Sequence, residues 1–377
     1  MGKLPEFRLE AFLSKWEFSA RFHLTASDAQ TLSVSELVAL ADAEDRKAWD
    51  ELSLGYTQTS GDPGLRRAIA DSYERLDAED VVCFAGAEEG LYLAMHVLLE
   101  PGDHAVVATP NYQAAESVPL SICDVTGVAL DPDDGWSLDL DAVAAALRPN
   151  TRVVSVCFPN NPTGKVIDEA SFRRLAELCD ERGAHLFSDE VYRGLEREPV
   201  RTLPQAADLS ERALSLNVTS KALGLPGLRV GWIACRDRDV RSRLERAKYY
   251  TSICNSAPSE VLARIALKAR ERILARNRDI IRANLPRFAA FFAQFPDLFE
   301  WEPPDGGCVC FPRYKGPDGV EAFCTALVEE AGVVTLPASI YRSELTPTPT
   351  DRFRIGVGRA DAEPALDAFA AWLRSRG

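Results

Sequence analysis

Length, composition and charge already exclude several classes of protein. The chain has 377 residues, 46% of them hydrophobic and 27% charged, which is typical of a soluble globular protein with two or three cores. The 57 acidic and 43 basic residues give a formal net charge of -14, which disfavours binding to nucleic acid or to an anionic membrane surface. We find no apolar stretch of about 20 residues that would span a membrane, and no signal peptide at the N-terminus.

The cysteines indicate the compartment. Nine of them, an odd number, are scattered through apolar runs, which is typical of buried and reduced thiols. Cys308 and Cys310 have no second Cys or His pair at ligand spacing, so we expect no metal site. We therefore expect a cytoplasmic protein.

Residues 80–236 alternate short β-rich runs with amphipathic helical segments. We expect helices near 88–99, 138–147 and 169–182, the last with Leu175, Leu178 and Cys179 on one face. Nearly continuous apolar runs between helices predict a mostly parallel sheet that is covered on both faces, and hence an α/β fold. The expected strands are 81–84, 105–108, 152–156, 184–187, 213–216 and 230–233.

After Tyr250 the pattern changes. Pro258 opens a helical stretch that continues to about Phe295 and is long enough to join two domains. A compact strand–helix–strand–strand–helix unit follows from residue 308 to 374. We therefore predict a large α/β domain of residues 46–255. Residues 1–45 and 256–377 are expected to form a small α+β domain that includes the long connecting helix.

Small or polar residues follow each of the first five expected strands. Ligands of open parallel sheets bind beyond the carboxyl ends of the strands. Each group has an ordinary structural interpretation, such as a turn at residues 161–164, a helix cap at Asp189 or a solvated charge at Lys221. Those interpretations would have to hold independently at every strand end, so we favour one shared ligand site. The groups are residues 85–89, 109–112, 158–164, 188–192 and 217–229.

Together these groups resemble the fold-type I pyridoxal-5'-phosphate enzymes, specifically the class I/II aminotransferase family. The resemblance covers roughly residues 50–360 and implies an aspartate-aminotransferase-like fold with a mostly parallel large domain and a smaller α+β domain. Its most specific parts are residues 161–164 and 220–229. The residues that carry it are Tyr56, Gly86, Ala87, Tyr112, 161–164, 189–192, Ser220, Lys221, 224–229 and Arg354.

The resemblance implies a role for each residue around the cofactor ring. Lys221 would bind the cofactor covalently and, once released, transfer protons. Asp189 would pair with the pyridinium nitrogen, and Asn161 and Tyr192 with the ring oxygen, while Tyr112 would stack on the ring. An amine is nucleophilic only when it is neutral, and a nearby cation such as Arg229 would lower the pKa of the lysine.

The phosphate group would bind at the other end of the cofactor. The turn before the expected helix at 88–99 offers free backbone N–H groups, which suit an anion. The resemblance assigns the phosphate to the N–H groups around Gly86, Ala87 and Glu88, and to the side chains of Ser220 and Arg229. Val218 stands where the family often has a further hydroxyl, and Asn217 and Thr219 are the two candidates to compensate for it.

Substrate and subunit contacts are also implied. Tyr56 would reach the phosphate of the neighbouring subunit, which makes the protein a homodimer. Arg354, preferred over Arg352, would bind the substrate α-carboxylate together with Asn161. A second arginine for dicarboxylic substrates is not identifiable, so aspartate and glutamate are disfavoured as amino donors.

The N-terminal segment departs from the family pattern. Residues 24–30 contain neither the Gly nor the Pro that many members have there. Asp28, with Glu17 nearby in the sequence, could face a cationic substrate side chain; alternatively, Asp28 caps a turn.

The resemblance implies an aminotransferase that moves an amino group from an amino acid to a 2-oxo acid by a ping-pong reaction. A pyridoxal-phosphate-dependent lyase, replacement or cyclising enzyme is the alternative, because it would share every cofactor residue. A regulatory domain fused to a DNA-binding module is disfavoured by the acidic charge.

Overall fold

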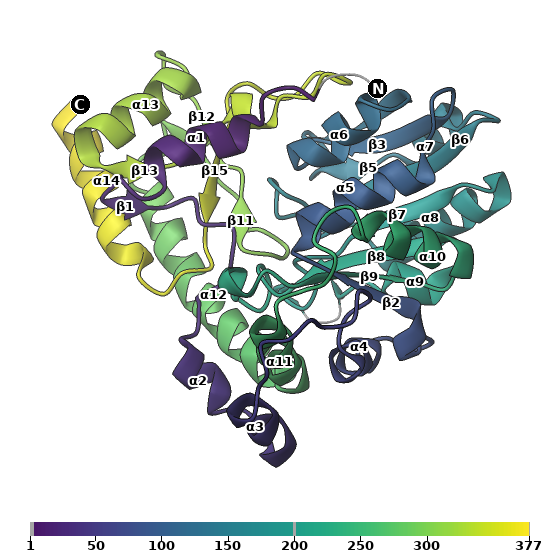
Figure 1. Cartoon of the computed structure of the whole chain (residues 1–377). Coiled ribbons are helices and arrows are strands. Elements are labelled where there is room, and N and C mark those ends of the chain that lie inside the picture. Colours follow the sequence, from purple (N-terminus) through teal and green to yellow (C-terminus); the bar gives the residue numbers. More distant parts are fainter. Residues whose placement is uncertain (1–3, 199–200, 377) are drawn as a thin grey trace.

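The computed structural model describes residues 4–198 and 201–376 and is built around one eight-stranded sheet (Figure 1). The strand order is β2-β9-β8-β7-β6-β3-β4-β5. Four neighbouring pairs are parallel, whereas β9 is antiparallel to both β2 and β8, and β5 is antiparallel to β4. The mostly parallel α/β sheet is therefore confirmed. Its strands are β2 (Val81–Phe84), β3 (His104–Thr109), β4 (Asp124–Asp131), β5 (Ser137–Leu138), β6 (Thr151–Cys157), β7 (His185–Asp189), β8 (Ala213–Val218) and β9 (Gly231–Cys235).

All six expected strands are present, but the sequence pattern missed β4 and the two-residue β5, and β4 shows why. Its residues alternate between exposed and buried positions and include Gly127, so the segment lacks the continuous apolar run of the central strands. Gly127 is required because a Cβ atom there would lie 2.6 Å from the Cβ of Leu345. A strand near the edge of the sheet is therefore mistaken for a loop when strands are predicted only from continuous apolar runs.

Helices cover both faces of the sheet, which explains the apolar strands. Neighbouring residues of a strand point to opposite faces, so Phe187 packs with one layer of helices and Leu186 with the other. Both side chains are fully buried, and each contributes about 1.5–3 kcal/mol of hydrophobic stabilisation. One face is covered by α5 (Ala87–Leu98), α6 (Gln113–Leu120) and α10 (Arg238–Lys248), and the other by α7 (Leu140–Ala146), α8 (Glu169–Arg182) and α9 (Ala206–Leu209).

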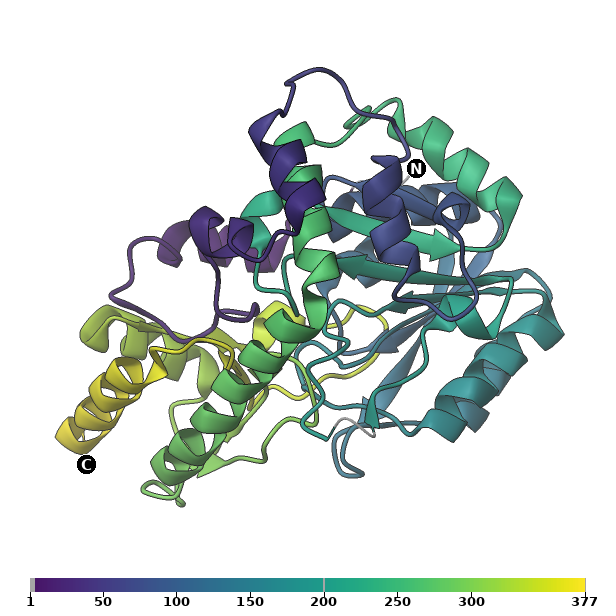
Figure 2. The same cartoon turned by 90° about the horizontal axis from the view of Figure 1, so that it is seen from below.

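The long connecting helix is two helices, and this corrects the sequence prediction. Helix α11 (Ala257–Lys268) ends at Ala269, and α12 (Arg270–Phe292) begins after it. Helix α11 packs on α2 (Val34–Val38), α3 (Ala43–Asp50) and α4 (Pro63–Ala70), whereas α12 packs on α14 (Ala362–Arg376). The helix is interrupted at Ala269, and the two halves on either side of it pack against different partners. Figure 2 shows α12 running between the sheet and the C-terminal part.

The C-terminal part forms a second, smaller layer that includes the N-terminal segment. Strand β1 (Phe22–His23) pairs with β13 (Val333–Val334), which places this part of the N-terminal segment beside the C-terminal elements. The predicted strand–helix–strand–strand–helix unit is confirmed. Its elements are α13 (Val320–Ala331), α14, and the strands β11 (Val309–Cys310), β14 (Leu336–Pro337) and β15 (Phe353–Gly356); the short strands β10 (Phe299–Glu300) and β12 (Arg313–Tyr314) and helix α1 (Arg8–Trp16) complete the fold.

One hydrophobic cluster contains side chains from both parts of the molecule. Val154 of the sheet and Phe369 of α14 belong to it, as does Phe288 of α12. The division at residues 45/46 and 255/256 therefore stays a prediction. Within the described residues, no helix combines the length and the apolar character that crossing a membrane requires.

Candidate active site

A cavity of about 630 Å³ lies between the carboxyl edge of the sheet and the N-terminal segment. Most of the residues singled out from the sequence line it, although they are widely spaced in the chain. The lining includes Ala87, Glu88, Tyr112, Asn161, Asp189, Tyr192, Ser220, Lys221, Arg229 and Arg354.

The sheet topology explains why these residues converge. Asp189 ends β7, and Ser220 and Lys221 directly follow β8, so parallel strands deliver them to one edge. Strand β9 runs antiparallel to both β8 and β2, so the two reversals leave β2 parallel to β8. Gly86, just beyond the end of β2, therefore reaches the same edge.

Gly86 is required at the start of α5 by its backbone angle and by its neighbours. It has φ of 94°, and a Cβ atom there would collide with the guanidinium group of Arg229. Gly231 is equally constrained, since its Cβ would lie 2.6 Å from the carbonyl carbon of Gly86. Nη1 of Arg229 lies 3.4 Å from Oγ of Ser220. A helix N-terminus, a guanidinium and a hydroxyl thus meet at one end of the cavity, and this combination suits an anion.

Neither Thr219 nor Asn217, the two residues that could compensate for Val218, lines the cavity. Oγ1 of Thr219 donates to the carbonyl oxygen of Val230 at 3.0 Å, so it points into the protein. Asn217 accepts the backbone N–H of Val218 at 2.8 Å. Val218 itself lines the cavity.

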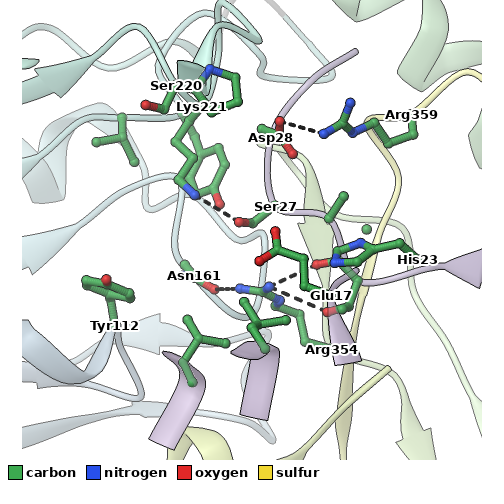
Figure 3. A pocket seen from close by; sticks show the side chains of 18 of the residues that line it. Glu17, His23, Ser27, Asp28, Tyr112, Asn161, Ser220, Lys221, Arg354 and Arg359 are labelled. Atoms are coloured by element: carbon green, nitrogen blue, oxygen red, sulfur yellow. Dashed lines mark hydrogen bonds and ion pairs between the residues drawn. The ribbon is translucent and has the colours of Figure 1, made fainter. Parts of the chain in front are cut away.

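The amine of Lys221 points into the cavity and donates to Oγ of Ser27 at 2.9 Å (Figure 3). Burial, and next the positive charge of Arg354, lower the pKa of Lys221 below its ordinary value. Arg354 thus takes the part that the sequence assigned to Arg229, which lies beside Ser220 at the anion end. A lower pKa favours the neutral, nucleophilic amine.

Asp189 and Tyr192 present polar groups that lack a full set of partners. One carboxylate oxygen of Asp189 accepts the N–H of Val191 at 3.1 Å, and burial raises the pKa of Asp189 to about 6. The hydroxyl of Tyr192 is buried without a hydrogen-bond partner in the part of the chain that the structure describes. A cation beside Asp189 would stabilise its ionised form and lower its pKa again. Burial likewise raises the pKa of Glu88 to about 7.

Arg354 is the most buried charged group of the cavity, with 1% of its surface exposed. Its guanidinium donates to Oδ1 of Asn161 at 3.1 Å and to the carbonyl oxygen of Thr25 at 2.9 Å. Its Nε is buried without a partner within residues 4–198 and 201–376. Arg352 instead lies over the ring of Trp136, 5.0 Å from its centroid, away from the cavity.

The N-terminal segment contributes residues whose contacts the sequence did not predict. Asp28 neither caps a turn nor carries a free charge, because it forms an ion pair with Arg359 at 2.7 Å. Figure 3 shows the Glu17 carboxylate reaching toward Arg354, beside the His23 ring. Among the described residues, Glu17 has no ion-pair partner. The missing Gly and Pro marked this segment as unusual, but no sequence signal singled out Ser27, His23 or Arg359.

Tyr56 lies outside the cavity and is 93% exposed. Next to it, the hydroxyl of Thr57 donates to the carbonyl oxygen of Asn255 at 3.0 Å, which joins this segment to residues 249–255. The neighbouring side chains Leu54, Tyr250 and Ile253 are exposed as well.

With this geometry established, the comparison with known proteins identifies the family. The model of the family "Aminotransferase class I and II" matches residues 23–369. The chain therefore belongs to the class I/II aminotransferases, which are fold-type I enzymes that use pyridoxal phosphate, as the resemblance implied.

Individual relatives cover nearly the whole chain. Capreomycidine synthase of Streptomyces vinaceus is 30% identical over 98% of this chain and 94% of its own length. The arginine–pyruvate transaminase AruH of Pseudomonas aeruginosa is 31% identical over 83% of this chain and 80% of its own length. The crystal structure of a pyridoxal-phosphate-dependent aminotransferase from Streptococcus suis superposes with a TM-score of 0.91 at 28% identity, covering 99% of this chain and 98% of that one. The aspartate-aminotransferase-like fold is confirmed.

Proposed function

We propose that this aminotransferase takes the amino group of an amino acid with a cationic side chain and transfers it to a 2-oxo acid. The observation that carries the transfer is the grouping of Lys221, Asp189 and Arg354 in one cavity. In this proposal, Lys221 holds the cofactor aldehyde, Asp189 pairs with the ring nitrogen, and Arg354 and Asn161 bind the α-carboxylate. Pyridoxal phosphate, when bound, supplies the electron sink for the reaction at the substrate α-carbon.

The residues present fit this cofactor. The anion end formed by Gly86, Ala87, Ser220 and Arg229 suits its phosphate, since a Cβ atom at Gly86 would fill that space. The unpartnered hydroxyl of Tyr192 has the chemistry to bond the ring oxygen. Asp189 is a buried carboxyl whose raised pKa calls for a nearby cation, which the protonated ring nitrogen would provide. Tyr112 lines the same cavity and would cover one ring face.

The charge and the shape of the cavity wall near α1 support the proposal that the amino donor has a cationic side chain. The charge of Asp28 is neutralised by Arg359, which leaves Glu10 and Glu17 on this wall of the cavity without an ion-pair partner among the described residues. Leu9 and Leu13 line the same wall and offer apolar contact for a methylene chain. A substrate held by its α-carboxylate at Arg354 would thus place a distal cation near Glu17. The likeness to an arginine–pyruvate transaminase supports the same class.

A panel of amino donors tests this proposal. The loaded protein should convert its cofactor to pyridoxamine phosphate with arginine or ornithine faster than with alanine or phenylalanine, and pyruvate should reverse the conversion. The conversion is followed by absorbance and by the alanine formed. Release of ammonia, or a product that keeps its nitrogen in a new ring, would overturn transamination.

Replacing Glu17 by Gln tests the cationic preference separately. The change should lower kcat/KM for arginine roughly tenfold, because an exposed carboxylate that pairs with a bound cation is worth about 1 kcal/mol or slightly more. The rate with alanine should not change. The exposed Glu329→Gln is the matched control, since it lies on α13 away from the cavity. Equal losses for arginine and alanine would contradict the assignment.

A lyase, replacement or cyclising reaction is the second candidate. One relative that spans almost the whole chain is named a synthase and not a transaminase. The cofactor residues serve either reaction equally. Product analysis of the same panel decides between them.

We further propose a cytoplasmic homodimer. Exposed apolar residues are typical of subunit contacts, and two segments that the hydrogen bond from Thr57 to Asn255 joins carry the exposed side chains of Leu54, Tyr56, Tyr249, Tyr250 and Ile253. All nine cysteines are free thiols, which supports a reducing compartment.

Light scattering should give twice the mass of one chain.

Tyr56→Phe should weaken cofactor binding about tenfold, since it removes one hydrogen bond to a charged phosphate in the partner's site. Tyr250→Phe is the matched control, as this tyrosine is 92% exposed on the same patch. A monomer, or an equal effect of both substitutions, would argue against shared sites.

A further inference from the structure

Residues 24–30 are bound in place over Lys221. The backbone N–H of Leu24 donates to Val334 at 3.2 Å, and its carbonyl oxygen accepts from Gly356 at 2.9 Å. Further along, the N–H of Ala29 donates to the carbonyl oxygen of Lys221 itself at 3.1 Å. The segment is therefore tied to β13, to β15 and to the lysine.

Three glycines make this close approach possible. The carbonyl oxygen of Ala26 lies against Gly356, so a Cβ atom there would collide with it. A Cβ at Gly358 would lie 2.7 Å from the carbonyl oxygen of Asp28, and a Cβ at Gly224 would lie 2.6 Å from that of Gln30. Such contacts leave no room for the segment to shift sideways. Ser27, at its centre, is consequently held at a fixed position.

We propose that Ser27 is a positioning residue for Lys221. This inference rests on the proposed role of Lys221, and it deepens that role. The Ser27 hydroxyl is 2.9 Å from Nζ, and the backbone bond from Ala29 fixes the other end of the same lysine. The side chain and the main chain of Lys221 are thus both bonded to one rigid segment. Ser27 thereby aims the free amine at the substrate α-carbon.

The chemistry of the amine explains what this contact does. When Lys221 is not attached to the cofactor, its neutral nitrogen takes the proton from the α-carbon and becomes an ammonium group. The added N–H then has Ser27 Oγ as an acceptor in a cavity where burial and Arg354 disfavour the charge. The Lys221 ammonium group would then release this proton again to the bound substrate, which returns the lysine to its neutral form. Ser27 itself forms and breaks no covalent bond, so it acts only through its hydrogen bond to Nζ of Lys221.

Ser27→Ala tests the proposal in the full-length holoenzyme. With arginine as donor, kcat should fall about 10- to 100-fold while KM stays unchanged, because proton transfer is sensitive to small errors of position. The isotope effect with α-deuterated arginine should rise, since proton transfer becomes slower than the other steps. Ser27→Thr keeps the hydroxyl and should restore most of the rate. Ser14→Ala removes an exposed hydroxyl of α1 away from the cavity and should change nothing.

A second measurement does not depend on turnover. In protein loaded with pyridoxamine phosphate, Lys221 is free, and its modification by an amine-specific acylating reagent can be followed by peptide mass spectrometry. Loss of the acceptor destabilises the ammonium form, so Ser27→Ala should lower the pKa of Lys221, and the midpoint of modification, by about one pH unit.

The outcomes separate this inference from the proposed function. An unchanged isotope effect together with an unchanged modification midpoint would overturn the role of Ser27, even if arginine is a good donor. If no amino acid converts the cofactor, the proposed function fails, and the midpoint shift alone decides whether Ser27 controls the amine. A loss in Ser27→Ala that Ser27→Thr does not restore would count against the hydroxyl.

Discussion

Replacing Lys221 by Ala should abolish covalent attachment of the cofactor and lower turnover by about ten-thousand-fold or more. Within residues 4–198 and 201–376, Lys221 is the one lysine that lines the cavity, and its lowered pKa favours the neutral amine that attacks an aldehyde. Borohydride reduction followed by peptide mass mapping measures the attachment directly. In the wild-type protein, the peptide that contains Lys221 should carry the cofactor mass.

Lys248 provides an internal control for that measurement. It is also buried and its pKa is also lowered, first by burial. Its Nζ, however, donates to the carbonyl oxygens of Thr59 and Cys83 and to Oδ1 of Asn255, at 2.6–2.7 Å. All three of its N–H groups are used, so the Lys248 peptide should stay unlabelled. A label on Lys248, or one that persists in Lys221→Ala, would refute the assignment of the attachment site.

Arg354→Lys is the second substitution with a large expected effect. It should lower kcat/KM for arginine by about 100- to 1000-fold, because an ammonium group cannot reproduce the planar pair of donors that binds a carboxylate. The contacts of the guanidinium with Asn161 and Thr25 would be lost at the same time. Steady-state kinetics with arginine and pyruvate measure the effect.

The choice of substrate shows whether the α-carboxylate is responsible. Agmatine, which is arginine without that carboxylate, should be a poor substrate of the wild-type protein and should lose little further rate in Arg354→Lys. Arg352→Lys is the neighbouring control, since Arg352 donates to Phe311 and lies over Trp136. Equal losses with arginine and agmatine would mean that Arg354 acts on folding or on the cofactor instead.

The sequence predicted well the site residues that directly follow strands of the sheet. It did not predict the contacts of residues that lie between the N-terminal segment and the C-terminal part. Asp189, Ser220 and Lys221 could be found because each stands immediately after an apolar run, and parallel strands bring such positions together. The same logic cannot pair Asp28 with Arg359, which are 331 residues apart and meet because β1 pairs with β13 and Leu24 bonds to Gly356 of β15. The sequence alone left the Asp28 carboxylate available for a substrate cation, whereas in the fold Arg359 neutralises its charge.

Two further features depended on tertiary contacts. The end of α11 at Ala269 has no Gly or Pro to mark it, and it arises because α11 and α12 pack on different partners. Ser27 could not be predicted, because nothing in a short polar segment reveals that three distant glycines fix the path of its backbone.

The sequence left two interpretations of Asp189, a helix cap and a ligand contact. Its bond to the N–H of Val191 shows that a turn contact and a place in the cavity occur together.

The hydrophobic cluster shared by the sheet, α12 and α14 limits how the molecule can move. Trp136 of the large part and Phe311 of the C-terminal part, whose ring centroids are 6.1 Å apart, would lose this apolar contact if the two parts separated, at a cost of about 1.5–3 kcal/mol for each large side chain exposed. Wide hinge opening between them is thus energetically unfavourable. Substrate entry and product exit are left to the periphery, where α1 forms the outer wall of the cavity and buries only Leu9.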